Sequence, residues 1–447
     1  MFGLSALLAL SGCSTTHDAA WQEPRPLGET IPSYRPPIEV PADTLAYGAP
    51  AVTDTLTLRK ALALSLQFNP TLQAFGWEVR AREAHGLQAG LVPNPEIGFE
   101  AENFGGTDDL NGFDSAELTL EISQLLELGG DRRRRRDVAH LERDLAGWDY
   151  ETVRLDVLTE TKQAFVGVLA AQERLNLSDT LLSIAGEFHR TAAARVEAGK
   201  SSVIEHRRAQ IVLSTAEIAY YQASQELSVA RAQLSAAWGR SEPTFGVAVG
   251  ALKTVTSIPP YEALEVFVQR NPDVARWRDE MALRHSDVAL EKAVGIPNPT
   301  LRFGPRRLRG TAQSALVAGI TIPLPIFNRN QGEVNEAKYR LEQGAALQRA
   351  TETFARQVLA ETYGRLVAAH NAAEKLITEV VPAADQNFQA TYQGYQAGKF
   401  DILMVLDAQR TLFETTNQYI DALLDYHRTK ADVERLVATP ISILAIR

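Results

Sequence analysis

The chain has 447 residues, 45% of them hydrophobic, and is therefore long enough to bury a large core. Its 55 acidic and 45 basic residues give a formal net charge of −10, which excludes a general affinity for nucleic acid. It contains no nucleophile elbow, phosphate-binding loop or zinc-hydrolase motif, so the sequence predicts no enzyme, no catalytic residue and no cofactor.

The N-terminus has the pattern of a bacterial lipoprotein signal peptide. Cys13, the only cysteine, follows an apolar run and completes the motif Leu10-Ser11-Gly12-Cys13. The run is too short to cross a bilayer as a helix, and small residues before the cysteine suit cleavage. We therefore expect residues 1–12 to be removed and Cys13 to carry acyl chains, palmitate among them. In bacterial lipoproteins, a serine such as Ser14 directly after the cysteine favours the outer membrane over the inner membrane. The alternative interpretation is that Cys13 follows an ordinary secretory signal by chance.

Residues 13–54 are predicted to form an extended arm, because they are polar and contain seven prolines. A first repeat then spans residues 55–239. It opens with a short helix at about 56–67, followed by a second helix that starts at Pro70 and runs to about 91.

Period-two alternation predicts a β-hairpin at about 94–126. Ile97 and Phe99 alternate with glutamates, and the pattern returns at Leu118 and Leu120 after a glycine- and aspartate-rich loop. One face is thus apolar and the other acidic. If the apolar face meets lipid, these carboxylates face a water-filled lumen: Glu96, Glu100, Glu102, Glu117 and Glu121. A wet wall of mixed polarity explains the same residues without any preference for cations.

A helical hairpin at about 129–238 completes the first repeat. Apolar residues from Leu141 to Leu169 follow a coiled-coil spacing. The helix continues to about residue 196, which is roughly 100 Å at 1.5 Å per residue. It breaks at Ala198-Gly199-Lys200 and returns along residues 202–238.

The chain then repeats itself at a distance of about 200 residues. A linker at 240–260 leads into a second repeat at 261–439, with a β-hairpin at about 298–323, a helical hairpin at about 328–437 and a tail at 440–447. The predicted fold class is mainly α with a small β part, built from a duplicated unit. Three motifs of the first repeat recur in the second. Asn69-Pro70 returns as Asn271-Pro272, Pro93-Asn94-Pro95 returns as Pro297-Asn298-Pro299, and the turn Ala198-Gly199-Lys200 returns as Ala397-Gly398-Lys399.

Four strands from one chain cannot close a sheet in lipid, because each unpaired backbone group at an open edge costs several kcal/mol. A membrane interpretation therefore requires several copies: two would supply eight strands and three would supply twelve. The periodicity does not choose between them. A soluble hairpin that caps a helical bundle is the alternative.

Both strand-to-helix junctions resemble those of a known family. They lie at residues 122–130 (ISQLLELGG, followed by arginines) and residues 323–332 (PLPIFNRNQG). They resemble the TolC-like outer-membrane factors, or outer membrane efflux proteins, and within them the heavy-metal branch typified by CzcC and CusC. The resemblance implies a homotrimer with a twelve-stranded outer-membrane β-barrel above a long periplasmic α-barrel.

The same resemblance implies partners and a function. The partners are a periplasmic adaptor, or membrane fusion protein, an inner-membrane pump of the RND type, and outer-membrane lipid. The expected protein is a passive exit duct, lipid-anchored in the outer membrane with a large periplasmic portion. It would export heavy-metal cations such as cobalt, zinc, cadmium or copper.

Functional positions in the helical hairpins are also implied by the resemblance. The turns at Gly199-Lys200 and Gly398-Lys399 look like the tips where the adaptor docks, although glycine there also suits a plain helix stop. Asp407 falls on one of two positions that carry paired aspartates at the periplasmic aperture of TolC, and Met404 occupies the other. A single ring of carboxylates could attract cations and resist closing through mutual repulsion.

Two further patterns are interpreted as structural. The five arginines at 132–136 wrap all faces of a helix start without interleaved aromatics, so we expect a solvated helix near phosphate headgroups, not nucleic-acid contact. The eight histidines are scattered, so the sequence predicts no metal site. Drug efflux or type I secretion is the first rival function, and a lipid-anchored periplasmic coiled-coil adaptor is a rival of another class.

Overall fold

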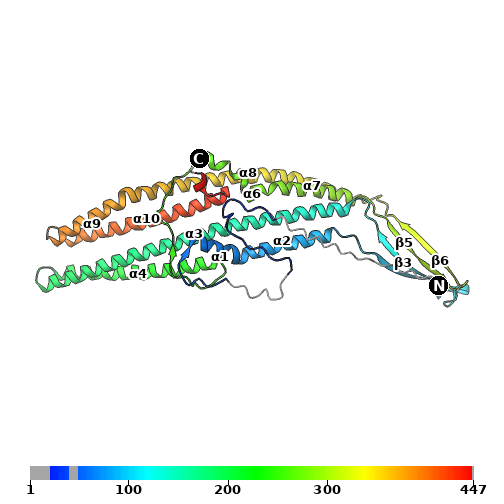
Figure 1. Cartoon of the computed structure of the whole chain (residues 1–447), viewed down its shortest axis with the longest axis horizontal. Helices are drawn as coiled ribbons and strands as arrows, with labels where there is room; N and C mark the ends of the chain where they lie inside the picture. The colour runs from blue at the N-terminus through cyan, green and yellow to red at the C-terminus, as the bar shows by residue number, and fades with distance from the viewer. Residues whose placement is uncertain (1–20, 40–48, 445–447) are drawn as a thin grey trace.

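The protein is a long rod with a β-sheet at one end and the turns of two helical hairpins at the other (Figure 1). The computed structural model describes residues 21–39 and 49–444, so the predicted signal peptide and Cys13 lie outside the described residues. Helices dominate the described part, and its strands form one four-stranded and one two-stranded sheet. This confirms the predicted class, mainly α with a small β part.

The N-terminal arm, in its described part at residues 21–39, packs along the helices. The Tyr34 amide donates to the carbonyl of Leu66 at 2.8 Å, and the Tyr150 hydroxyl donates to the carbonyl of Tyr34. Leu27 is buried at 2% exposure, and its amide donates to the carbonyl of Ala438 at 3.2 Å. The described part of the arm, which includes a turn at residues 26–31, is therefore fastened to both repeats.

Two helices precede the first β-hairpin, α1 (Leu58–Phe68) and α2 (Pro70–Ala89). Asn69 caps α2 by accepting a hydrogen bond from the Leu72 amide at 3.0 Å, and Pro70 occupies the first turn, where no N–H is needed. Just before α1, β1 (Leu56–Thr57) pairs in parallel with β4 (Ala248–Val249) of the linker.

The strands of both repeats form one antiparallel sheet in the order β2-β3-β5-β6. Its register places Ile122 opposite Ile97 of β2 and opposite Phe303 of β5. Among the described residues, the outer edges of β2 and β6 have no partner strand, so one chain leaves both edges open. The bounds are β2 (Glu96–Glu102), the 3-10 turn η2 (Asp108–Leu110), β3 (Glu117–Leu125), β5 (Thr300–Leu308) and β6 (Gln313–Thr321).

β5 carries Gly304-Pro305 in the interior of the sheet, where proline is unusual because it lacks an N–H. The pairing of β5 with β3 skips Leu120 and Glu121 at this level. A Cβ atom at Gly304 would overlap the carbonyl oxygen of Leu120. Glycine is therefore required here for the close approach of the two backbones.

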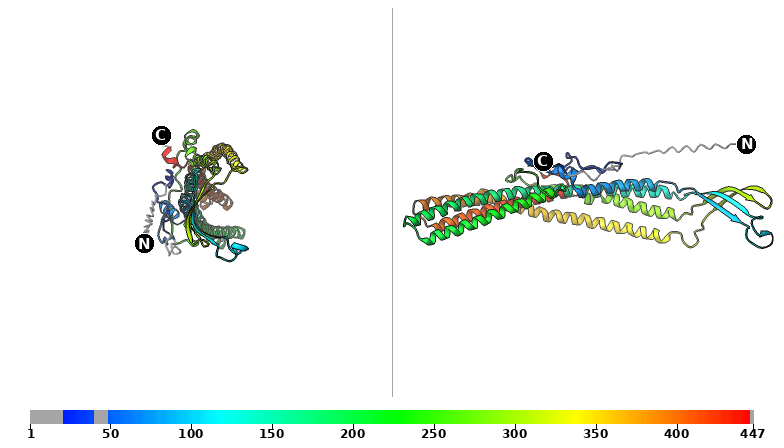
Figure 2. Two further views of the ribbon diagram at one scale, coloured as in Figure 1. Left: turned by 90° about the vertical axis from the view of Figure 1, so that its right-hand side faces the viewer. Right: turned by 90° about the horizontal axis from the view of Figure 1, so that it is seen from below.

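Two helical hairpins form the shaft of the rod (Figure 2). The 67 residues of α3 correspond to roughly 100 Å. Near the turns, aromatic side chains join the hairpins, since Phe188 of α3 packs with Phe388 and Tyr395 of the second hairpin. The first hairpin is α3 (Asp131–Glu197) and α4 (Val203–Ala236), and the second is α8 (Gln331–Lys375), α9 (Val381–Gln396) and α10 (Ile402–Val437).

The first arm of the helical hairpin predicted at about 328–437 is interrupted by a π-helical segment, η4 (Leu376–Val380). The cause lies in Pro382. Proline in a helix interior removes one hydrogen bond and clashes with the carbonyl four residues earlier. The wider π turn accommodates both effects without breaking the helix.

The second repeat starts with shorter helices than the first. Asn271 accepts a hydrogen bond from the Asp273 amide at 2.8 Å and so caps the helix that starts at Pro272, much as Asn69 caps α2. Within the described ranges, no helix combines the length and apolarity needed to cross a bilayer. The remaining bounds are α5 (Tyr261–Glu265), η3 (Val268–Arg270), α6 (Pro272–Ala275), α7 (Trp277–Val294) and α11 (Ile441–Leu444).

Candidate functional site

The five glutamates predicted to line a lumen share one face of the four-stranded sheet. In the β2–β3 register, Glu96, Glu100 and Glu102 lie opposite Ser123, Thr119 and Glu117, and Glu121 lies opposite Gly98. All of these positions have the same parity along their strands, so their side chains point to the same side. The geometry therefore allows one continuous acidic surface.

Two arginines of the second repeat lie on the same face, a feature that the sequence interpretation missed. Arg306 forms ion pairs with Glu102 at 3.0 Å and Glu117 at 2.9 Å, and Arg302 lies 3.6 Å from Glu121. Since Glu102 and Glu117 are directly opposite each other, Arg306 offsets a like-charge contact. The acidic surface is partly neutralised.

The other face of the sheet is apolar and exposed in the single chain. Ile97 is 79% exposed, Phe99 70% and Leu316 72%. A contiguous apolar surface of this kind marks contact with a membrane or a partner, and its polar reverse side is typical of a strand that separates lipid from water. Further exposed apolar side chains on this face are Leu120, Ile122, Leu301, Phe303 and Ile320.

Both hairpin turns end in a left-handed glycine. Gly199 has φ of 67° and Gly398 has φ of 75°. The Lys200 amide donates to the carbonyl of Arg195 at 2.9 Å, and the Lys399 amide donates to that of Gly394 at 2.8 Å, as in a Schellman cap. Capping alone accounts for both glycines, while the exposed Lys200 and Lys399 stay available to a partner.

Asp407 and Met404 lie close to the start of α10, and Met404 is 51% exposed. The Asp407 carboxylate accepts a hydrogen bond from Arg410 at 2.8 Å, and Arg410 lies 4.0 Å from Glu414. Asp407 is therefore an ion-paired carboxylate, which weakens the expected repulsion within a ring of copies. The i, i+3 spacing of Arg410 could have revealed this pair from the sequence.

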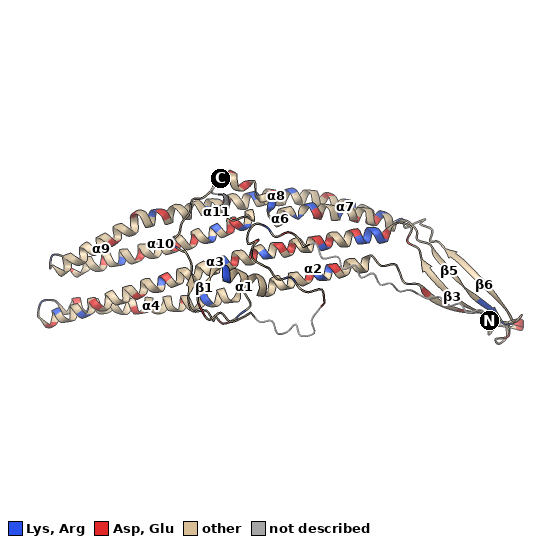
Figure 3. Ribbon diagram, in the orientation of Figure 1, with Lys and Arg blue, Asp and Glu red and all other residues tan. Residues whose placement is uncertain are grey.

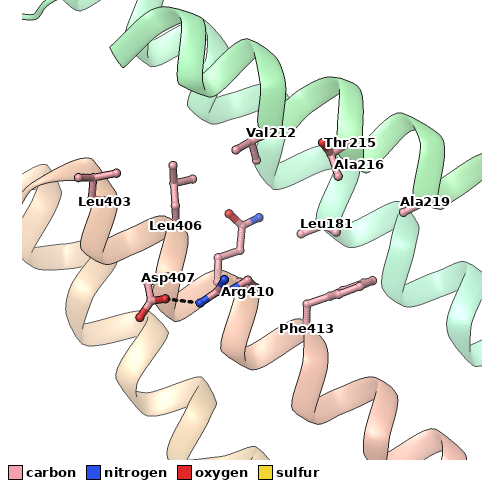
Figure 4. Close-up of a pocket in the computed structure, with 11 residues that line it drawn as sticks. Leu181, Val212, Thr215, Ala216, Ala219, Leu403, Leu406, Asp407, Arg410 and Phe413 are labelled. Carbon is pink, nitrogen blue, oxygen red and sulfur yellow. Dashed lines mark hydrogen bonds and ion pairs between the residues drawn. The ribbon is translucent and has the colours of Figure 1, made fainter. Parts of the chain in front are cut away.

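A cavity of about 440 Å³ separates α10 from the first hairpin beside Asp407 (Figure 4). Gln409 is only 4% exposed, and its Nε2 atom has no hydrogen-bond partner among the described residues. Beside Asp407, α10 of the second hairpin is thus not packed directly against α3 and α4 of the first hairpin. The apolar walls are Leu181 of α3, Val212, Ala216 and Ala219 of α4, and Leu403, Leu406 and Phe413 of α10.

Two of the histidines described as scattered meet in space. The rings of His189 on α3 and His206 on α4 lie 4.9 Å apart between centroids. The antiparallel packing of α3 and α4 brings them together on either side of the turn at Ala198-Gly199-Lys200, so the contact follows from the predicted helical hairpin and not from the histidine spacing alone. Within the described residues, no group of three or more histidine, cysteine, aspartate or glutamate side chains is arranged to hold a metal ion.

The fold and the two-faced sheet define a class of protein, the protomer of a TolC-like outer-membrane channel. The crystal structure of CusC matches with a TM-score of 0.72 and 16% identity, covering 92% of this chain and 99% of that chain. At such low identity the match shows the fold alone.

The chain belongs to the outer membrane efflux protein family, whose model matches residues 61–240 and 263–439. Cobalt-zinc-cadmium resistance protein CzcC of Cupriavidus metallidurans is 33% identical over 382 residues, 86% of this chain and 90% of CzcC. Nickel-cobalt-cadmium resistance protein NccC of Alcaligenes xylosoxydans xylosoxydans is 27% identical, covering 71% of this chain and 72% of NccC.

These matches confirm the resemblance drawn from the two junctions. The protein is an outer-membrane efflux channel component and not an enzyme. Family membership also argues against the rival interpretation as a periplasmic adaptor.

Proposed function

We propose that the protein is the exit duct of a tripartite efflux system that exports heavy-metal cations. The observation that carries this proposal is the 33% identity to a cobalt-zinc-cadmium resistance protein over 86% of the chain. The acidic face of the sheet is compatible with cation passage, although Arg302 and Arg306 moderate it. Selection among metals then falls to the pump, because the duct's described residues hold no metal site.

The duct is proposed to be a homotrimer whose three four-stranded sheets close into a twelve-stranded barrel. Two features support closure with neighbouring copies. The edges of β2 and β6 are unpaired in the described chain, which is not tolerated in hydrocarbon. The apolar face of the sheet is exposed, as a lipid-facing surface requires.

The internal repeat supports a specific register for that closure. Phe99 and Phe303 each stand five residues after the asparagine of a Pro-Asn-Pro motif, so they are equivalent. Their hairpin partners, Leu120 and Ala318, are then equivalent as well. Two residues further along the strands, Ile122 of β3 corresponds to Ile320 of β6.

Within the chain, Ile122 lies opposite Phe303 across the junction of the two repeats. If the junction between subunits copies this geometry, Ile320 lies opposite Phe99 of the neighbouring subunit. Both positions are on the apolar face, as the pairing requires. A slip of one residue would turn every side chain of the strand to the wrong face.

Asn94 supports the same closure. Its equivalent, Asn298, accepts from the Leu128 amide at 2.9 Å and donates to Asp131 at 2.6 Å, which links the repeats at the strand-to-helix junction. Asn94 is exposed and makes no hydrogen bond with the described residues. We expect Asn94 to make the equivalent hydrogen bonds to the second strand-to-helix junction (residues 323–332) of the neighbouring copy. That junction also exposes apolar side chains that the neighbour would cover: Leu324, Ile326 and Phe327.

The remaining parts of the proposal concern partners and anchoring. A periplasmic adaptor would dock at the turns around Gly199-Lys200 and Gly398-Lys399, and would link the duct to an inner-membrane RND pump. Asp407 and Met404 would lie at the periplasmic aperture. Cys13 would carry the acyl anchor, which is supported by the lipoprotein motif in the sequence.

Deletion of the gene tests the cargo. We expect the deleted strain to lose tolerance to at least one of zinc, cobalt, cadmium, nickel and copper, and a plasmid copy to restore it. Tolerance to a dye such as ethidium serves as the comparison. Loss of dye tolerance with unchanged metal tolerance would reject the metal assignment in favour of drug efflux.

A further inference from the structure

The arginines at the start of α3 are poorly explained by the fold alone. Of the five at 132–136, only Arg135 forms an ion pair within the described residues, with Glu127 at 2.6 Å. Positive charge at a helix N-terminus opposes the helix dipole. The buried Asp131 offsets this only in part, because it supplies one negative charge against five positive ones. The other four arginines therefore have no ion-pair partner among the described residues. Their positive charge also destabilises the start of α3.

These arginines lie beside the end of the sheet, at the sheet-proximal end of α3 (Figure 3). Exposed apolar side chains surround this level: Leu87 is 70% exposed, Leu91 57% and Leu128 66%. If the apolar face of the sheet lies in lipid, this is the level of the phosphate layer of the inner leaflet. An apolar surface followed by free cations is the arrangement that suits an anionic lipid.

A cavity of about 460 Å³ lies between α2 and α3 at this end of the shaft. Leu87 of α2 and Leu91, two residues beyond the end of α2, form apolar walls, and Arg136 and Arg143 of α3 supply charge. Glu83 also lines the cavity, but Arg80 pairs with it at 2.7 Å. Among the described residues Arg143 has Asp144 as a partner at 2.6 Å and Arg136 has none.

The cavity is a positive environment. Burial lowers the pKa of His140 from its ordinary value, and the neighbouring Arg143 and Arg136 lower it further. Arg136, His140 and Arg143 follow each other at helical spacings of four and three residues, so they form one stripe along α3. Arg132 and Arg134, in the first turn of α3, do not line the cavity.

The second repeat provides an internal comparison. Gly130 and Asn330 are the equivalent left-handed residues that precede α3 and α8. Counted from them, Arg133 and Arg136 correspond to Glu333 and Glu336. The equivalent cavity between α7 and α8, of about 400 Å³, contains both of these glutamates. The same helix start is thus built with the opposite charge, so the fold itself does not require the arginines.

We propose that the α2–α3 cavity binds the phosphate headgroup of an anionic phospholipid of the inner leaflet, with Arg136 and Arg143 at the phosphate and Leu87 and Leu91 along the acyl chains. The inference rests on the proposed placement of the sheet in the outer membrane. The α7–α8 cavity of the same chain does not bind this lipid, because its glutamates repel the phosphate.

Lipid retention by the full-length protein in dodecylmaltoside tests the proposal. Dioleoylphosphatidylglycerol is titrated onto the assembled protein, and bound lipid is counted by native mass spectrometry. The double variant Arg136→Gln/Arg143→Gln is expected to bind on the order of thirty-fold more weakly, given about 1 kcal/mol for each arginine at a lipid surface. The matched control, Arg132→Gln/Arg134→Gln, removes the same charge from exposed positions that do not line the cavity and should retain the lipid.

Four results would overturn the proposal: equal binding by wild type and Arg136→Gln/Arg143→Gln, an equal loss in the control variant, equally tight binding of dioleoylphosphatidylcholine, or full displacement by inorganic phosphate. Far-UV circular dichroism and the assembly size verify that both variants fold. Because binding is measured in detergent, without any cargo, its failure is distinct from failure of the exit-duct proposal, which metal tolerance reports.

Discussion

Glu151 and Arg154 form a buried ion pair at the middle of the rod, with side-chain exposures of 2% and 1% and an N–O distance of 2.7 Å. The pair holds the N-terminal arm, because Glu151 accepts from the Arg25 amide at 2.8 Å and Arg154 donates to the carbonyl of Leu27 at 3.1 Å. From the sequence, this i, i+3 pair is indistinguishable from any exposed pair on a helix. Only the arm buries it.

Removing one member of this pair is therefore expected to be costly. Glu151→Ala leaves the Arg154 guanidinium buried without its carboxylate, and we expect a loss of about 3–5 kcal/mol in the free energy of unfolding. Denaturant unfolding followed by circular dichroism measures it. The double variant Glu151→Met/Arg154→Met is the control and should lose much less. Equal stability of Glu151→Ala and wild type would contradict the assigned role.

His427 on α10 gives a prediction for pH. Its Nε2 atom lies 2.7 Å from the carbonyl oxygen of Leu252. Burial lowers the pKa of His427, although the bond to that carbonyl and the charge of Glu434 oppose the shift, while Lys430 reinforces it. A base whose pKa is lowered by folding binds more protons when unfolded. Stability is therefore full above the ordinary histidine pKa and falls as the pH drops below it.

The expected result is a melting temperature that decreases between pH 7.5 and pH 5, with a smaller decrease in His427→Gln. His285→Gln, at an exposed position on α7, is the matched control and should follow wild type. Parallel curves for wild type and His427→Gln would show that His427 contributes nothing to the pH dependence.

The elements themselves were largely predictable from the sequence. Period-two alternation located β2, β3, β5 and β6, and the glycine turns located the ends of the helical hairpins, because residue type fixes local backbone geometry at these points. The pairing of β3 with β5 was not predictable, since the paired residues lie between 175 and 191 positions apart in the sequence and nothing local joins them. For that reason the lumen-facing glutamates were proposed without Arg302 and Arg306.

Arg306 yields a prediction at the level of the sheet. Arg306→Gln removes the cation between Glu102 and Glu117 and leaves the polar face more acidic. The cation-to-anion permeability ratio of the reconstituted protein should rise, by up to roughly fivefold if one charge acts within 4 Å in water. Bilayer recordings at low salt measure it, because salt screens the effect.

Arg307→Gln is the matched control for this experiment. Arg307 is adjacent in sequence, pairs with Ser314 at 3.2 Å and points to the opposite face. The same loss of charge there should leave the permeability ratio unchanged. An equal change in both variants would mean that the two faces are not separated as lumen and lipid.

The register between subunits is the prediction for the whole molecule. The double variant Phe99→Cys/Ile320→Cys should form disulfide bonds between subunits on mild oxidation, because directly opposed strand residues lie within disulfide reach. Non-reducing gels should then show a covalent trimer. Cys13 is the only native cysteine and is expected to be acylated, so the background is low.

Two controls define the register. Phe99→Cys/Leu316→Cys places the second cysteine four residues along β6, beyond disulfide reach, and should stay monomeric on the gel. Ile122→Cys/Phe303→Cys should form a bond within the chain, since these residues are opposed in one sheet. Cross-linking in the off-register variant, or none in the predicted one, would refute the register.

The two open edges of the sheet also have a genetic consequence. In the proposed trimer each copy must offer both β2 and β6 for the ring to close, so a single faulty copy would spoil every assembly that contains it. Alleles that alter these edges are therefore expected to be dominant over a normal gene in the same cell. Alleles that merely stop the chain from leaving the cytoplasm remove it from competition, and they should be recessive.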